Sequence, residues 1–182
     1  MHFAREAGYR DVSGVDAAKQ QVEVAVALGI EGVREGGILE TLAAAAEGSL
    51  DLIVTFDVME HFAKDDLLRL VDAVHRGLRH GGCWIIHVPN GDSPFVGSIL
   101  YDDLTHELAF TRESLAQLLL ASGFQDVRCH EDAPVVHGPK SAIRAILWRV
   151  IRAGLRLYIA TETGNASGDA VLTRNLLAVA RK

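Results

Sequence analysis

Residues 50–61 read Leu50-Asp51-Leu52-Ile53-Val54-Thr55-Phe56-Asp57-Val58-Met59-Glu60-His61, and this stretch decides the fold. Its first seven residues are mostly apolar, rich in β-branched types and too few for a good helix, so they predict a buried parallel strand. Three polar side chains, Asp57, Glu60 and His61, follow directly. Because ligands of open α/β sheets bind beyond the carboxyl ends of the strands, these side chains are candidates for a functional site.

The rest of the chain alternates between strand-like and helix-like periodicity. Further strands are expected near 14–16, 83–88, 127–130 and 171–180, and helices near 17–28, 65–78 and 111–122. Strands separated by helices of about 12 residues are typical of parallel sheets. We therefore expect an α/β fold with a doubly wound, mainly parallel sheet and helices on both faces.

Length and composition restrict the class of protein. A chain of 182 residues suits a single domain over residues 1–182, and its formal charge of −6 gives no electrostatic reason to bind nucleic acid. Cys83 and Cys129 lie too far apart in sequence for a zinc cluster, which favours a reducing, cytoplasmic location. The first eight residues lack the hydrophobic core of a signal peptide.

Two more polar positions follow predicted strands. Asp16 ends the run Gly14-Val15-Asp16, where a carboxylate can accept both hydroxyls of a ribose. An aspartate before a helix is equally typical of an N-cap, so both interpretations stay open. The second position is the segment from His87 to Gly91, where a proline and an asparagine turn the chain out of the sheet.

Together these segments resemble the class I S-adenosylmethionine-dependent methyltransferases. Gly14-Val15-Asp16 is similar to the ribose-binding acid at the end of that family's second strand, and residues 51–61 are similar to its fourth strand with the Glu-His ending. Residues 78–82 and the following strand to Asn90 resemble the approach to the fifth strand. Thr105-His106-Glu107 and Phe110-Thr111 resemble a subgroup that modifies hydroxyls on sugars or quinone precursors.

The resemblance implies a Rossmann-like fold with S-adenosylmethionine as cofactor. It implies ribose binding by Asp16, adenine contacts from Gly37, Ile38 and Phe56, and a place for Asp57 in the cofactor site. Gly37 stands where the family often has an acid. His106, together with His61, is the expected catalytic pair, and the expected reaction is methyl transfer to oxygen of a small or saccharide-type acceptor, as in polysaccharide biosynthesis.

One departure from the family concerns the N-terminus. The family's first strand and glycine-rich loop precede the helix that here ends at Gly8, so we expect an N-terminally incomplete fold. In the family that strand lies between the strands ending at Asp16 and Phe56, so without it two edges would keep unpaired backbone groups. Closure of the two edges on each other, a partner strand, and a shortened sequence are three explanations, of which we favour the last.

The segment Asp57-x-x-Glu60-His61, with His106, permits two interpretations. Its spacing puts the side chains on one face of a helical turn, where a divalent metal could bind. Hydrogen bonding within the loop explains the same residues without metal and is favoured. For His106 itself, a neutral imidazole can take the proton of an attacking hydroxyl. It can equally cap a helix or bind a backbone carbonyl.

The segment 137–165 is expected to be a basic amphipathic helix and loop inserted before the last strand. It carries Lys140, Arg144, Arg149, Arg152 and Arg156, and apolar residues recur along it at helical spacing. Such a helix suits peripheral contact of residues 140–160 with an anionic membrane surface. The alternative is a helix packed on the sheet with solvated arginines. A non-catalytic, protein-binding or membrane-surface module remains the alternative to the enzyme as a whole.

Overall fold

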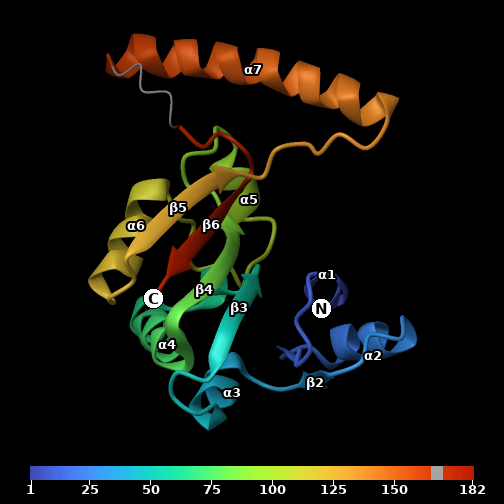
Figure 1. Cartoon of the computed structure of the whole chain (residues 1–182). Coiled ribbons are helices and arrows are strands. Elements are labelled where there is room, and N and C mark those ends of the chain that lie inside the picture. The colour runs from blue at the N-terminus through green and yellow to red at the C-terminus, as the bar shows by residue number, and fades with distance from the viewer. Residues whose placement is uncertain (165–169) are drawn as a thin grey trace.

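The computed structural model describes residues 1–164 and 170–182 of the chain (Figure 1). Its strands are β1 (Gly14–Asp16), β2 (Val33–Glu35), β3 (Leu50–Phe56), β4 (Leu78–Pro89), β5 (Asp126–Glu131) and β6 (Asn175–Arg181). Its helices are α1 (His2–Glu6), α2 (Lys19–Ala27), α3 (Ile38–Ala44), α4 (Lys64–Gly77), α5 (Val96–Leu100), α6 (Arg112–Ala121) and α7 (Pro139–Thr163), with a 3₁₀ turn η1 (Met59–His61).

The strands form two sheets. β1 and β2 pair in parallel, and the larger sheet has the order β3-β4-β6-β5. β3 and β4 are parallel, whereas β6 runs antiparallel to both β4 and β5. The expected Rossmann-like α/β class with a mainly parallel sheet is confirmed, and β6 is the reversed strand.

One face of the larger sheet carries the core. Its inward side chains are fully buried on β4 and β6, and α4 and α6 contribute leucines and valines to the same cluster. The buried residues of this layer are Trp84, Ile86, Val88, Leu176, Ala178, Ala180, Leu70, Val71, Val74, Leu115 and Leu119. Trp84 also donates its indole N–H to the Thr55 hydroxyl at 3.0 Å, which joins β4 to β3 inside this layer.

The opposite face of the sheet is less covered than expected. On β3, Ile53 and Thr55 are buried, whereas Val54 is 47% exposed and Phe56 is 57% exposed. The prediction of a buried strand is therefore correct for one face of β3 and wrong for the other. The physical reason is that successive side chains of a strand point to opposite faces, and the core that buries Ile53 lies on only one of them.

The two sheets do not join. Within residues 1–164 and 170–182, the free edges of β1 and β3 have no strand partner, so the idea that these edges close on one another is wrong. The small sheet is instead connected to the core through α3. Arg76 of α4 donates to the backbone carbonyl of Leu42 at 2.6 Å, and Leu42 belongs to the core.

Two element boundaries differ from the sequence prediction. α4 ends at Gly77, and β4 already begins at Leu78, so residues 79–82 are strand and not a cationic last turn with a glycine stop. The last strand begins at Asn175 and not near Val171. The reason is that the buried amide of Asn90 donates to the carbonyls of Val171 and Thr173, both at 2.8 Å, and fixes that stretch as a loop.

α7 occupies most of the expected segment 137–165, whose last residue lies outside the described residues. Figure 1 shows this helix extended across the end of the molecule to which β5 points. Because β3, β4 and β5 run in one direction, their carboxyl ends lie toward the same end. Among the described helices none has the length and apolarity needed to cross a bilayer.

The packing of α6 on the sheet gives a direct stability prediction. Leu119→Ala should lower the free energy of unfolding by about 2–5 kcal/mol, because Leu119 is fully buried and truncation leaves a cavity. Leu120→Ala on the same helix is the control, since Leu120 is 52% exposed, and should change stability by less than about 0.5 kcal/mol. Urea unfolding measures both, and equal losses would contradict the packing described here.

Candidate functional site

The segment after β3 turns sharply at Asp57. This residue has a φ of 51°, an uncommon left-handed conformation for a non-glycine residue, and η1 begins two residues later. The turn places Glu60 inside the protein and His61 at the surface. The carboxyl end of β3 thus presents two chemically different groups side by side.

A distant loop is fastened to this turn by backbone hydrogen bonds. The carbonyl of Glu60 accepts from the amides of Glu107 at 2.8 Å and Leu108 at 3.1 Å. These bonds bring the imidazoles of His61 and His106 together, with ring centroids 4.9 Å apart. The two residues of the expected catalytic pair, 45 positions apart in sequence, are therefore neighbours.

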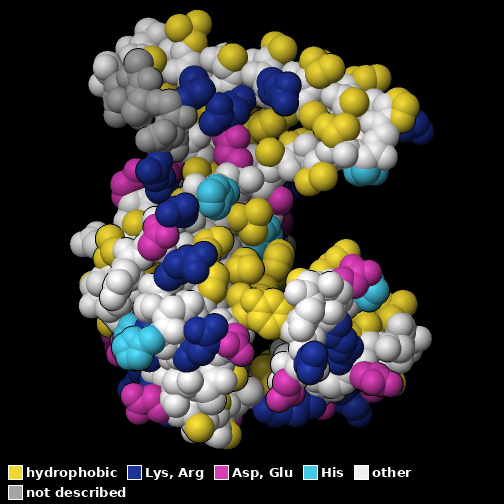
Figure 2. Space-filling view, in the orientation of Figure 1, with side chains coloured by type: hydrophobic (Ala, Val, Ile, Leu, Met, Phe, Trp, Pro, Cys, Tyr) yellow, Lys and Arg dark blue, Asp and Glu magenta, His cyan; other side chains and the backbone are white. Residues whose placement is uncertain are grey.

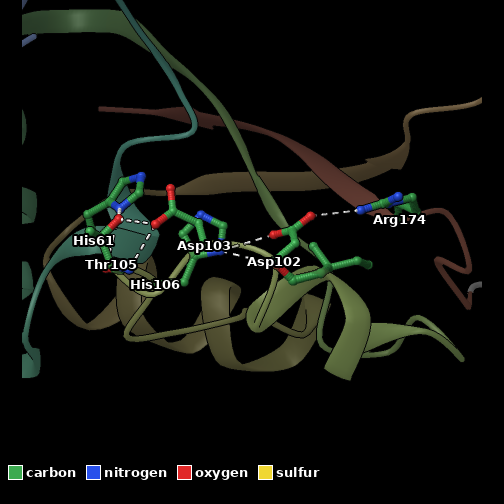
Figure 3. A network of polar contacts seen from close by, with 7 residues as sticks. His61, Asp102, Asp103, Thr105, His106 and Arg174 are labelled. Carbon is green, nitrogen blue, oxygen red and sulfur yellow. Dashed lines mark hydrogen bonds and ion pairs between the residues drawn. The ribbon is translucent and has the colours of Figure 1, made fainter.

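The hydrogen bonds around His61 determine its tautomer (Figure 3). The Thr105 hydroxyl donates to a carboxylate oxygen of Asp103 at 2.7 Å, so its single proton is used there. The Thr105 oxygen must then accept at 2.9 Å from Nδ1–H of His61. In neutral His61, Nε2 consequently keeps a free lone pair.

The hydrogen bonds around His106 fix the same tautomer as in His61. The Nδ1 of His106 lies 3.2 Å from the carbonyl of Ile99, which can only accept, so Nδ1 carries the proton. Asp102 lies 3.9 Å from the same nitrogen and is paired with Arg174 at 3.2 Å. The carbonyl-binding alternative for His106 is thus realised through Nδ1, and Nε2 of the neutral ring stays available.

Asp103 is an ionised acceptor in this network. Hydrogen bonds from the Thr105 amide and hydroxyl hold the pKa of Asp103 below its usual value. Its negative charge orients Thr105 and, through it, His61. Figure 3 shows Asp103 between Thr105 and His106, with Asp102 next along the same loop.

Glu60 is the most unusual group of the site. Its side chain is 1% exposed, and neither carboxylate oxygen has a hydrogen-bond partner among the described residues. Loss of hydration raises the pKa of Glu60, while its own backbone amide and the nearby imidazoles act in the opposite direction. Buried carboxylates normally have hydrogen-bond partners, so the Glu60 carboxylate is a candidate for a functional role.

A second polar group joins β3 to β4. His87 Nδ1 contacts the Asp57 carboxylate at 2.7 Å, and Nε2 lies 3.6 Å from Asp132. The His87 ring stacks on Phe56, with centroids 5.0 Å apart and planes at 21°. Phe56 therefore presents an oriented aromatic surface at the strand end, and Asp57 is committed to His87.

The other predicted cofactor residues lie at the carboxyl ends of β1 and β2. One oxygen of Asp16 accepts from the amide of Ala18 at 2.8 Å, so it orders the turn ahead of α2, whose N-cap is Ala18. The Asp16 carbonyl also accepts from the amide of Gly36 at 3.0 Å, next to Gly37. Asp16 and Gly37 are thereby held together, and Ile38 opens α3 and packs on the core.

Gly37 lies close to the carboxylate of Glu40, one helical turn further along. A Cβ at position 37 would meet only this far end of an exposed, flexible side chain, which can move away, so the contact alone does not require glycine. An acid is thus present beside Gly37, although the sequence comparison showed none at position 37 itself.

Several site residues escaped sequence reasoning. Asp102, Asp103 and Arg174 had no signal of their own, because their roles depend on loop segments that meet only in the folded chain. His87 did carry a signal, since it lies near the end of a predicted strand. Asp16 and Phe56 end strands of separate sheets, and they remain a predicted pair.

Comparison with known proteins identifies the family. A sequence profile described as a methyltransferase domain matches residues 1–129. A crystal structure of a SAM-dependent methyltransferase from Archaeoglobus fulgidus aligns with a TM-score of 0.72 at 19% identity, covering 100% of this chain and 80% of that one. No curated protein matches.

Two further structures share the fold. The S-adenosylmethionine-dependent methyltransferase from Mesorhizobium loti gives a TM-score of 0.62 at 18% identity, over 100% of this chain and 84% of that one. The 1,6-didemethyltoxoflavin-N1-methyltransferase from Burkholderia thailandensis was solved with bound 1,6-didemethyltoxoflavin and S-adenosylhomocysteine. It aligns with a TM-score of 0.55 at 20% identity, covering 100% of this chain and 64% of that one.

The described residues fit the nucleoside part of the methyl donor. Asp16 keeps one carboxylate oxygen beyond its bond to Ala18, which a ribose hydroxyl can use. The exposed Phe56 ring, held by His87, suits an adenine. From its sequence profile and fold, the chain belongs to the methyltransferase-domain family as a class I enzyme, and S-adenosylmethionine is its cofactor.

Proposed function

We propose that this methyltransferase acts on a hydroxyl oxygen of a small or saccharide-type acceptor. The observation that carries the proposal is the pair His61 and His106, 4.9 Å apart, each with Nδ1 engaged as a donor. Their neutral rings keep Nε2 lone pairs as proton acceptors at the carboxyl end of the sheet. A base is what an oxygen acceptor needs, because an alcohol must lose its proton as it is methylated.

The division of labour follows from the contacts. S-adenosylmethionine supplies the reactive methyl group on a sulfonium. We assign ribose binding to Asp16, and adenine contacts to Gly37, Ile38 and Phe56. Asp57 holds His87 and thereby the ring of Phe56, so its part in the cofactor site is indirect. His106, supported by His61, takes the hydroxyl proton, and its carbonyl partner Ile99 fixes the ring in place.

A second proposal concerns α7, which we assign to an anionic membrane surface. At about 100° per residue, the exposed apolar side chains of α7 fall within an arc of about 140°. These side chains are Ile143, Ile146, Leu147, Val150, Ile151, Leu157 and Tyr158. Figure 2 shows hydrophobic side chains along the side of α7 that faces away from the sheet.

The opposite side of α7 faces the domain. Arg152 of this side pairs with Glu131 of β5 at 2.8 Å, and Ser141 is buried. Arg144 and Arg149 are exposed on either side of the apolar arc, and Lys140, at the start of the helix, is exposed within it. This distribution favours membrane contact over the packed alternative, because packing has used only the side away from the arc.

The position of α7 connects the two proposals. The helix lies at the end of the molecule toward which the carboxyl ends of β3, β4 and β5 point (Figure 1). We therefore propose that the acceptor is presented at that membrane surface from the cytoplasmic side, as in synthesis of a cell-surface polysaccharide.

The cofactor assignment predicts a binding defect. Asp16→Asn should raise the Kd for S-adenosylmethionine about 10- to 100-fold, because hydrogen bonds to a charged carboxylate contribute about 1.5–3 kcal/mol. Asp11→Asn, an exposed change in the preceding loop, should leave the Kd unchanged. Calorimetric titration measures both. A folded wild-type protein that gives no heat at millimolar ligand would instead favour a non-catalytic domain.

The base assignment predicts a rate defect. His106→Gln should lower kcat about 10²- to 10⁴-fold, since glutamine can still donate to the Ile99 carbonyl but accepts no proton. The Kd for S-adenosylmethionine should stay unchanged. The assay uses labelled methyl donor with a panel of phenols, sugar nucleotides and glycosides, and His80→Gln, an exposed change, is the control. Transfer to amines only, at full rate in the variant, would contradict oxygen methylation.

The membrane assignment predicts a change in vesicle binding. Leu147→Glu with Val150→Glu should abolish co-sedimentation with phosphatidylglycerol vesicles, because both side chains lie exposed in the apolar arc. Val24→Glu with Val26→Glu places the same two charges on exposed apolar sites of α2 and should bind like wild type. Wild-type protein that binds neutral and anionic vesicles equally poorly would refute the proposal.

A further inference from the structure

The buried carboxylate of Glu60 points to a ligand beyond the methyl donor and acceptor. Glu60 is 1% exposed, and both of its oxygens lack a hydrogen-bond partner in the described part of the chain. A carboxylate withdrawn from water needs a compensating charge or donor. Asp57 is a neighbouring carboxylate and adds negative charge, and the imidazoles of His61 and His106 converge on Glu60 with free nitrogens that are acceptors in the neutral rings.

The three side chains converge. One donor atom from each of Glu60, His61 and His106 lies within 4.8 Å of the other two. Ligands of a tetrahedral ion at about 2.0–2.2 Å are themselves about 3.4 Å apart, so small side-chain rotations close the set. His61 is exposed and has room for such a rotation, whereas the His106 side chain is 12% exposed and held by the Ile99 carbonyl. Closing the set therefore depends chiefly on His61.

The surroundings of the two imidazoles match those of metal ligands. A metal-binding histidine generally donates its second ring nitrogen to a carbonyl, a carboxylate or a similar acceptor, which fixes its tautomer. His106 donates Nδ1–H to the carbonyl of Ile99, with Asp102 close by. His61 donates to the hydroxyl of Thr105, which is in turn bound to Asp103.

We propose that Glu60, His61 and His106 bind one divalent transition-metal ion, of the zinc or manganese class. Two imidazole nitrogens and one carboxylate favour such ions over magnesium and calcium, which prefer all-oxygen sites. Three protein ligands leave a coordination position open, and the exposure of His61 directs it to solvent. Hydrogen bonding within the loop, which the sequence favoured, involves the backbone carbonyl of Glu60 and the ring of His61, whereas the Glu60 carboxylate has no partner among the described residues.

The catalytic consequence rests on the proposed function, whereas ion binding does not. With the ion present, His61 and His106 are ligands, and an acceptor hydroxyl at the open position becomes more acidic by direct coordination. Its proton then leaves to solvent. Without the ion, His106 takes that proton itself.

Ion binding is tested on the full chain without methyl donor or acceptor. Chelator-treated protein is titrated with MnCl₂, ZnCl₂ and MgCl₂ by calorimetry, and Mn²⁺ binding is followed by electron paramagnetic resonance. We expect one Mn²⁺ or Zn²⁺ per chain, with Mg²⁺ at least 10-fold weaker. Binding of less than a tenth of an equivalent, or no preference over Mg²⁺, would overturn the proposal.

Variants identify the ligands. Glu60→Gln keeps the size of the side chain and should weaken Mn²⁺ binding at least 10-fold, and His106→Gln should do the same. Glu107→Gln, an exposed change in the same loop, is the control and should bind like wild type. Mn²⁺ should also raise the thermal midpoint of the wild type and not that of Glu60→Gln. Equal Mn²⁺ affinity in Glu60→Gln and wild type would overturn the assignment.

The outcome for methyl transfer is separate. Loss of transfer on chelation, restored by Mn²⁺, supports a catalytic ion. Absence of transfer to any oxygen acceptor, in protein that binds Mn²⁺ normally, would refute the proposed function and leave the metal site standing.

Discussion

The structure depends on one buried face of the larger sheet. Trp84, Ile86 and Val88 on β4 meet the leucines of α4 and α6 there. On the opposite face Val54 and Phe56 of β3 are exposed, and the outer edge of β3 has no strand partner among the described residues. β3 and β4 lie next to each other in parallel, and their inward side chains belong to this core. Because parallel strands end at the same edge, the polar residues that follow β3 and those near the end of β4 project from one end of the sheet, whereas Asp16 and Gly37 lie at the ends of the separate pair β1 and β2.

A single backbone acceptor assembles the histidine pair. The carbonyl of Glu60 receives the amides of Glu107 and Leu108, and so brings a loop about 45 residues away onto the end of β3. The same residue contributes its buried carboxylate to the pair it has assembled. Structure and chemistry are thus coupled at one position, because a change that moves the backbone of Glu60 also moves His106.

The local sequence pattern was sufficient to predict an element where neighbouring residues determine its structure. The run of residues 50–56 is apolar and β-branched, and β3 has those bounds. The exposure of Val54 and Phe56 could not be predicted from that run, because it depends on which face of β3 the rest of the chain packs against. Asp103 likewise acquires its role from Thr105 and His61, which meet it only after the loop is anchored.

The Glu60 carboxylate, which has no hydrogen-bond partner among the described residues, also explains why two interpretations of the histidine pair compete, one as proton acceptors and one as metal ligands. An imidazole beside a buried carboxylate can share a proton with it, or both can share a cation, and the two arrangements need the same tautomers at His61 and His106. They differ in charge. A proton on Glu60 leaves the cluster neutral, whereas a divalent ion with an ionised Glu60 leaves it positive by one unit. A positive cluster binds an oxygen acceptor as its anion, so the charge at Glu60 decides whether the hydroxyl is ionised before or during methyl transfer.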